Sequence, residues 1–204
     1  MIRGERINSI SHLVGAAFAL AGTVVLIVFS VLSGSGLKLG TALVYSIAVV
    51  LMFLFSTLYH GLRGPAKVVF HRFDHIGIYV LIAGTYTPFC LVVLRDASGY
   101  LIFGIVWSVA ILGIVFKSIF GPRYNGISTA LYVAAGWTVL LDISTLKARM
   151  PAAAFAWLLT GGVLYTVGAV FFLLKKIPLN HQIWHFFVLA AAACHFVSVF
   201  IVVT

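Results

Sequence analysis

Seven stretches of this chain are each long and apolar enough to cross a lipid bilayer as an α-helix. A spanning helix needs about 20 predominantly apolar residues, and lipid accepts only segments whose backbone groups bond internally. Seven such helices use most of the 204 residues and leave no room for a separate soluble domain. We therefore predict an all-α, seven-transmembrane helix bundle that forms a single membrane domain over residues 1–204, with helices at about 12–32, 39–60, 74–94, 100–119, 126–143, 152–174 and 181–203.

The composition favours an integral membrane protein and excludes a nucleic-acid-binding one. Hydrophobic residues make up 63% of the chain and charged residues only 8%, whereas a soluble domain has about 25% charged residues. The net charge of +9 comes from short loops between apolar stretches, where basic residues set the topology and meet anionic headgroups. Cys90 and Cys194 lie inside apolar runs, so we expect small core side chains rather than a disulfide.

Basic residues divide unevenly between the two sides of the expected bundle. The N-terminal side carries nine: Arg3, Arg6, Arg63, Lys67, Arg72, Lys117, Arg123, Lys175 and Lys176. The other side carries four: Lys38, Arg95, Lys147 and Arg149. The positive-inside rule therefore predicts a cytoplasmic N-terminus and a C-terminus outside.

Three histidines and an aspartate are expected at the cytoplasmic ends of different helices. His60 closes the second helix, Asp74 opens the third, and His181 and His185 open the last. Successive helices run in opposite directions through the membrane, yet these side chains are all expected at the same depth near its cytoplasmic face. Ionisable residues are costly in lipid and mark functional sites there, and the chain has only four acidic residues. The pattern predicts a site at this depth.

The residue types at this depth suit zinc. His181 and His185 are four residues apart and share a helix face, and His60 would supply a third imidazole. Three imidazoles leave the fourth zinc position open to water, as in catalytic sites, and zinc lowers the pKa of bound water to about 7. Asp74 is the expected general base, and Ser56, on the same face as His60, would hydrogen-bond the water or an oxyanion.

Other histidines have alternative uses. The pair in the last helix could instead bond to headgroups or loop carbonyls. His71 and His75 are also four apart, but we expect them to straddle a helix start, with His75 packing between helices or supporting the aspartate. His195 lies ten residues beyond His185, roughly 15 Å deeper, so we expect it to bond to another helix. His12 is either a partner behind the zinc ligands or an interfacial residue.

Short motifs run in order through the whole chain: Glu5-x-x-Asn8 with Ser11-His12, Ser56-x-x-x-His60, Asp74-His75, Ala83-Gly84-Thr85-Tyr86-Thr87-Pro88-Phe89 and His181-x-x-x-His185. Together they resemble the bacterial hemolysin III proteins, within the group that holds the progestin and adiponectin receptors. The resemblance implies a seven-helix protein of the bacterial inner (plasma) membrane. It also implies zinc held by His60, His181 and His185, with Ser56 and Asp74 beside it. The group is distantly related to alkaline ceramidases, which cleave lipid amides at a similar zinc site.

We therefore predict an intramembrane zinc-dependent hydrolase of a lipid amide or ester. Its partner would be a membrane lipid or fatty acid, and its output an adjustment of membrane lipid composition or fluidity. One alternative is a non-enzymatic membrane sensor or regulator in which structural zinc ties the second and seventh helices together. Another is a hemolysin-type channel protein acting in cytolysis, which would need a continuous polar path across the membrane.

Overall fold

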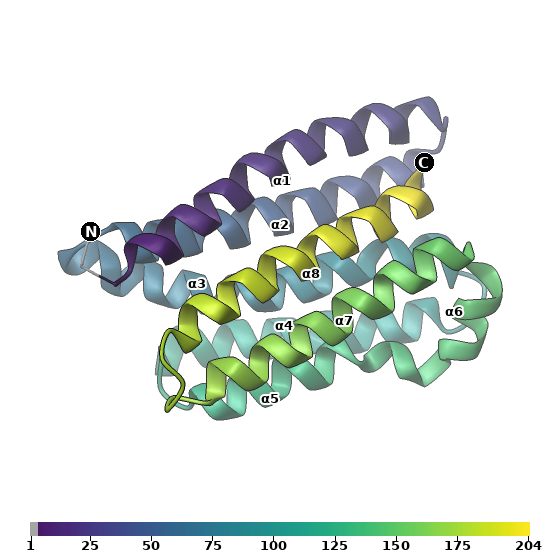
Figure 1. The fold of residues 1–204 in the computed structure, drawn as a ribbon. Helices are drawn as coiled ribbons and strands as arrows, with labels where there is room; N and C mark the ends of the chain where they lie inside the picture. The colour runs from purple at the N-terminus through teal and green to yellow at the C-terminus, as the bar shows by residue number, and fades with distance from the viewer. Residues whose placement is uncertain (1–3) are drawn as a thin grey trace.

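The computed structural model describes residues 4–204, and every regular element among them is helical. Seven helices or broken helices are long and apolar enough to cross a membrane, which confirms the predicted seven-helix bundle. They lie side by side, with the two chain ends at opposite ends of the bundle (Figure 1). The cytoplasmic placement of the N-terminus stays a prediction. The elements are α1 Arg6–Leu32, α2 Gly36–Gly61, α3 Gly64–Pro88, a π-helical turn Phe89–Val93, α4 Gly99–Phe120, α5 Asn125–Gly136, a 3₁₀ turn Thr138–Asp142, α6 Ile143–Arg149, α7 Ala152–Leu173 and α8 Asn180–Val203.

Large apolar side chains point outward as well as inward. Phe18 and Leu32 are each 74% exposed, and Leu112 is 68% exposed. A soluble protein rarely exposes broad apolar surface of this kind without a partner, whereas a lipid bilayer covers it at no cost. The chain is therefore an integral membrane protein.

The helices begin earlier than the sequence pattern suggested. We expected the third helix to open at Asp74, and this was wrong: α3 begins at Gly64, so Asp74 lies ten residues inside it. Pro65 fits the first turn of a helix, where its missing N–H costs nothing. Lys67 and Arg72 lie on helical turns that extend beyond the apolar stretch. Hydropathy measures the apolar core, and the helix continues into the polar layer where long basic side chains are solvated.

The fifth span is broken, although the sequence predicted one helix over 126–143. Helix α5 ends at Gly136, and a 3₁₀ turn and the short α6 complete the span. The Tyr86 hydroxyl donates to the Gly136 carbonyl at 2.7 Å and accepts from the Val139 N–H at 2.9 Å. A break at membrane depth is tolerated only where protein groups satisfy the freed backbone. Tyr86 of α3 supplies both partners.

The third span also changes form near its far end. Helix α3 ends at Pro88 and continues as the π-helical turn Phe89–Val93. Proline removes one backbone donor and crowds the preceding turn, which explains the change of helical form. This turn and the broken fifth span both border the interior of the bundle.

Candidate metal centre and membrane cavity

Three imidazoles meet at the end of the bundle where α2 finishes and α8 begins. His60 comes from the last turn of α2, and His181 and His185 come from the first two turns of α8. One nitrogen from each ring lies within 4.8 Å of the others. His60 and His185 are each only 2% exposed. The predicted convergence of these three side chains is confirmed, and the group could hold a metal ion.

The distances within the group suit a small tetrahedral ion. Nε2 of His60 lies 3.3 Å from Nε2 of His181. Zinc–nitrogen bonds of 2.0–2.1 Å at tetrahedral angles would place two ligand nitrogens roughly 3.3–3.4 Å apart. Among residues 4–204, no other histidine, cysteine or carboxylate joins the group. Three imidazoles with one position left over is the ligand set of catalytic zinc sites rather than of closed structural ones.

Aromatic packing holds these rings in place. The His12 ring of α1 stacks on His185 with centroids 3.8 Å apart and planes at 31°, and it meets Phe53 edge-on at 5.2 Å. The Tyr59 ring lies 4.4 Å from that of His60. Nδ1 of His60 and Nδ1 of His185 are buried without a hydrogen-bond partner. Ring contacts, rather than acceptors behind the rings, therefore orient these imidazoles, and His12 belongs behind the metal centre.

Ser56 and Asp74 line the same cavity as His181 and His185. Ser56 and Asp74 come from α2 and α3, respectively. Nδ1 of His75 lies 3.9 Å from Oδ2 of Asp74 and bonds to the His71 carbonyl at 2.9 Å. Asp74 is outside the group of three histidines.

His71 and His75 do not straddle a helix start, because both lie inside α3. The His71 ring stacks on Tyr59 with centroids 4.4 Å apart and planes at 5°. His75 is held by the His71 carbonyl, as described above, and lies beside the aspartate. Their position inside α3 has the same cause as that of Asp74: the helix begins well before the apolar stretch.

The segment before α1 covers the end of the bundle that holds the histidines. Lys67 forms an ion pair with Glu5, with Nζ 2.5 Å from Oε2, and also donates to the Tyr59 carbonyl at 3.1 Å. Gln182 donates from Nε2 to the Gly4 carbonyl at 3.0 Å. Residues 4–5 therefore connect the first turns of α3 and α8. The pairing of Lys67 with Glu5 was not apparent from the amino-acid sequence, because the two charges were expected in separate loops.

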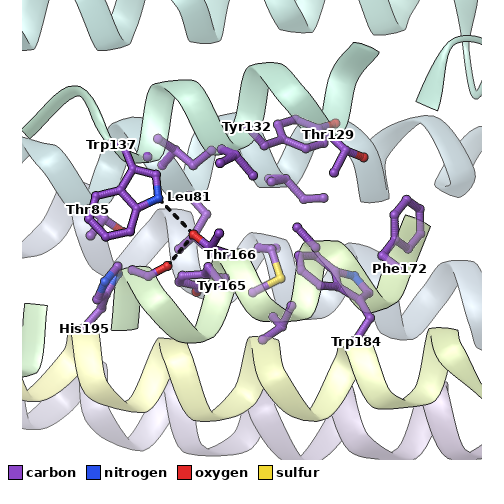
Figure 2. A pocket seen from close by; sticks show the side chains of 18 of the residues that line it. Leu81, Thr85, Thr129, Tyr132, Trp137, Tyr165, Thr166, Phe172, Trp184 and His195 are labelled. Carbon is purple, nitrogen blue, oxygen red and sulfur yellow. Dashed lines mark hydrogen bonds between the residues drawn. The ribbon is translucent and has the colours of Figure 1, made fainter. Parts of the chain in front are cut away.

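A cavity of about 310 Å³ extends from the histidines into the bundle. Its walls come mainly from α3, α5, α7 and α8 and are largely apolar. On α8 it is lined from His181 to His195, which spans roughly 21 Å at 1.5 Å per residue. Figure 2 shows the part where Trp137 donates from Nε1 to the Thr166 hydroxyl at 2.9 Å. The space is long and narrow, with its polar end at the histidines.

His195 is separate from the metal centre, as expected. Its Nε2 bonds to the Leu158 carbonyl of α7 at 3.2 Å, which confirms the prediction that this imidazole bonds to another helix. Cys90 and Cys194 are both free and buried, as predicted for small core side chains.

Comparisons with known proteins agree with these observations. The family described as "Haemolysin-III related" matches residues 1–196. The chain is 40% identical over 199 residues to "Hemolysin-3" of Bacillus cereus, covering 97% of this chain and 91% of that protein. It is also 40% identical over 199 residues to "Hemolysin-3 homolog" of Bacillus subtilis (strain 168), covering 97% and 93%. A more distant relative is "Monocyte to macrophage differentiation factor" of Homo sapiens, 28% identical over 167 residues, with 78% of this chain and 68% of that protein covered.

Proposed function

The chain belongs to the haemolysin III family, and on that premise we propose that it is an intramembrane zinc-dependent hydrolase of a lipid amide or ester. One observation carries the proposal: three imidazoles, joined by no fourth histidine, cysteine or carboxylate among residues 4–204, stand at the polar end of a long apolar cavity that Ser56 and Asp74 also line. A cavity with apolar walls and a few convergent polar groups is typical of a small-molecule site.

The chemistry divides among a few side chains. His60, His181 and His185 would hold the metal through their ring nitrogens. A zinc ion there would polarise the scissile carbonyl and lower the pKa of a bound water to about 7. Asp74 takes the proton from the attacking water and returns it to the leaving amine or alcohol. Ser56 would hydrogen-bond the attacking water or the oxyanion that forms from the carbonyl.

The cavity sets the substrate class. Its length and its apolar walls suit an acyl chain whose head group lies at the imidazoles. The walls also exclude bulk water, which strengthens electrostatic interactions inside the site. With the N-terminus in the cytoplasm of a bacterium, as the charge pattern predicts, the site opens near the inner leaflet of the plasma membrane. The products are a free fatty acid and the remainder of the lipid, so the reaction adjusts membrane lipid composition.

The test is fatty-acid release by purified, zinc-loaded protein from a panel of ceramides, N-acyl amides and phospholipids, followed by mass spectrometry. We expect Asp74→Asn to lower the rate on the order of 10²–10⁴-fold, the range for loss of a general base, with one metal still bound per chain. His60→Ala should lose both metal and activity. Asp96→Asn, a matched change in an exposed turn, should alter neither. A rate of fatty-acid release that Asp74→Asn leaves unchanged, or no release from any lipid, would contradict the proposal.

A second function, a sensor with structural zinc, is favoured by one observation. The three imidazoles come from two helices that are distant in sequence, so a shared ion would cross-link α2 to α8. In that case metal removal should unfold the bundle while Asp74→Asn changes no property of the zinc-loaded protein. Thermal unfolding with and without chelator, run beside the release assay, separates the two functions.

Lysis is the third candidate, because two relatives carry the name Hemolysin-3. A lytic protein should release dye from loaded vesicles, and the leakage should not depend on Asp74. Running this assay on the same protein preparations allows dye leakage and fatty-acid release to be compared directly.

A further inference from the structure

The part of the cavity far from the histidine centre contains a small group of polar side chains. Thr85 of α3, Tyr165 of α7 and His195 of α8 line it there, around the place where Trp137 meets Thr166 (Figure 2). We call these three side chains the distal polar patch. His195 lies ten residues beyond His185 on α8, so the patch is roughly 15 Å from the metal centre along the helix axis.

Trp137 and Thr166 already use their hydrogen-bonding groups, whereas the two hydroxyls of the patch do not. Thr166 accepts from Trp137 and donates to the Gly162 carbonyl at 2.8 Å. Across residues 4–204, by contrast, the hydroxyls of Thr85 and Tyr165 have no hydrogen-bond partner. Both residues line the cavity, so an occupant of the cavity can supply the partners that the protein does not.

His195 offers a third, complementary group. Its Nε2 faces the Leu158 carbonyl at 3.2 Å, and a carbonyl only accepts, so Nε2 carries the proton of the neutral ring. Nδ1 is then an acceptor, and no described side chain or backbone group donates to it. A bond between α7 and α8 explains Nε2 alone. It does not explain why an acceptor and two hydroxyls gather on one stretch of cavity wall.

The fold makes room for this imidazole. A Cβ on Gly161 of α7 would collide with the His195 ring, so glycine at this position allows the ring to lie against α7. The ring also packs on Tyr165, with centroids 5.3 Å apart. The imidazole is therefore fixed between α7 and the cavity, next to the Tyr165 ring.

We infer that the distal polar patch is a binding subsite for a hydroxyl group on an acyl chain. The hydroxyl would lie as far along the chain from the head group as the patch lies from the three histidines. The inference rests on the proposed function and names its substrate class: lipids with a hydroxylated acyl chain. The ligand hydroxyl donates to Nδ1 of His195 and accepts from Tyr165 or Thr85. An unsubstituted chain fills the same space but leaves these groups without partners.

The test compares three fatty acids of equal length, namely stearate, 2-hydroxystearate and 12-hydroxystearate. Each is titrated into purified, zinc-loaded protein in detergent, and binding is read from the fluorescence of Trp137 and Trp184, which both line the cavity. We expect 12-hydroxystearate to bind about three- to tenfold more tightly than stearate, the effect of one or two net hydrogen bonds. 2-Hydroxystearate, with its hydroxyl beside the head group, should show no such gain.

Variants test which side chains cause the preference for 12-hydroxystearate over stearate. Tyr165→Phe and Thr85→Val each remove one hydroxyl and little volume, and together they should bring the ratio of the two affinities to about one while stearate binding is unchanged. Thr160→Val is the matched control, because its exposed hydroxyl bonds within α7 to the Ala156 carbonyl. The control should keep the preference.

Two results overturn the inference: equal affinities in the unmodified protein, meaning that the patch holds only water, or a preference that survives the double substitution. Absence of binding by all three fatty acids overturns it as well. The proposed hydrolysis is judged separately. A preference for 12-hydroxystearate without lipid cleavage would support the subsite and reject the proposed hydrolase function. Lipid cleavage combined with equal affinities for 12-hydroxystearate and stearate would support the hydrolase and reject the subsite.

Discussion

The ring of His12 stacks on the ring of His185, with centroids 3.8 Å apart. His12 is only 3% exposed, and neither of its ring nitrogens has a hydrogen-bond partner. The contact therefore works through the ring face. It ties α1 to the first turns of α8 and limits the tilt of one of the three imidazoles that could hold a metal ion.

His12→Ala should weaken metal binding about 10–100-fold, the usual effect of losing support behind a metal ligand. His12→Phe keeps a flat ring against His185 and should retain most of the affinity. Competition with a chromophoric zinc chelator measures both. Equal affinities for the alanine variant and the unmodified protein would show that stacking does not position His185.

Tyr86→Phe should destabilise the bundle. The hydroxyl satisfies both the Gly136 carbonyl and the Val139 N–H at the break in the fifth span. Leaving a buried polar group unpaired costs about 1–3 kcal/mol, so the thermal unfolding midpoint in detergent should fall by several degrees. Tyr100→Phe, on an exposed tyrosine, is the control. An unchanged midpoint for Tyr86→Phe would mean that other groups can satisfy the break.

Gly161→Ala should also destabilise, because the added methyl meets the His195 ring. Overpacking costs about 1–3 kcal/mol, which outweighs the roughly 0.5–1 kcal/mol that alanine gains over glycine within a helix. In the double variant with His195→Ala the clash disappears, and the two effects should be clearly non-additive. Gly104→Ala of α4, whose added methyl meets no neighbour within 4 Å, should be neutral or slightly stabilising. Additive effects would argue against the clash.

Glu5→Gln should speed the removal of bound metal by a chelator. Glu5 and Lys67 fasten the segment that covers the histidine end of the bundle. Because the pair is partly exposed, its loss should cost no more than about 1 kcal/mol, which corresponds to at most roughly a fivefold faster rate. Stopped-flow mixing with chelator measures it, and Asp96→Asn serves as the charge-matched control. Identical rates would show that metal leaves by another route.

The sequence was sufficient for the number of spans and for the meeting of His60 with the pair on α8. Both follow from simple geometry: apolar length identifies spans, alternating direction fixes which ends are level, and a spacing of four puts His181 and His185 on one face. None of these arguments needs knowledge of packing.

Other features depend on packing and were beyond the sequence pattern. The start of the third helix was predicted wrongly because hydropathy marks the lipid core and not the helix start at Gly64. The break after Gly136 was missed because the Tyr86 hydroxyl that satisfies it lies fifty residues earlier in the chain. The partnership of Glu5 with Lys67 likewise depends on how the ends of α1 and α3 approach one another.

Two of the three imidazoles of the metal centre lie in the last helix, 121 residues after the first. During synthesis, the first six spans can therefore enter the bilayer with only one of the three ligands in place. Any ion must wait until α8 has been inserted and docked against α2. Occupancy would thus report that insertion is finished, and chains truncated before α8 should emerge without metal.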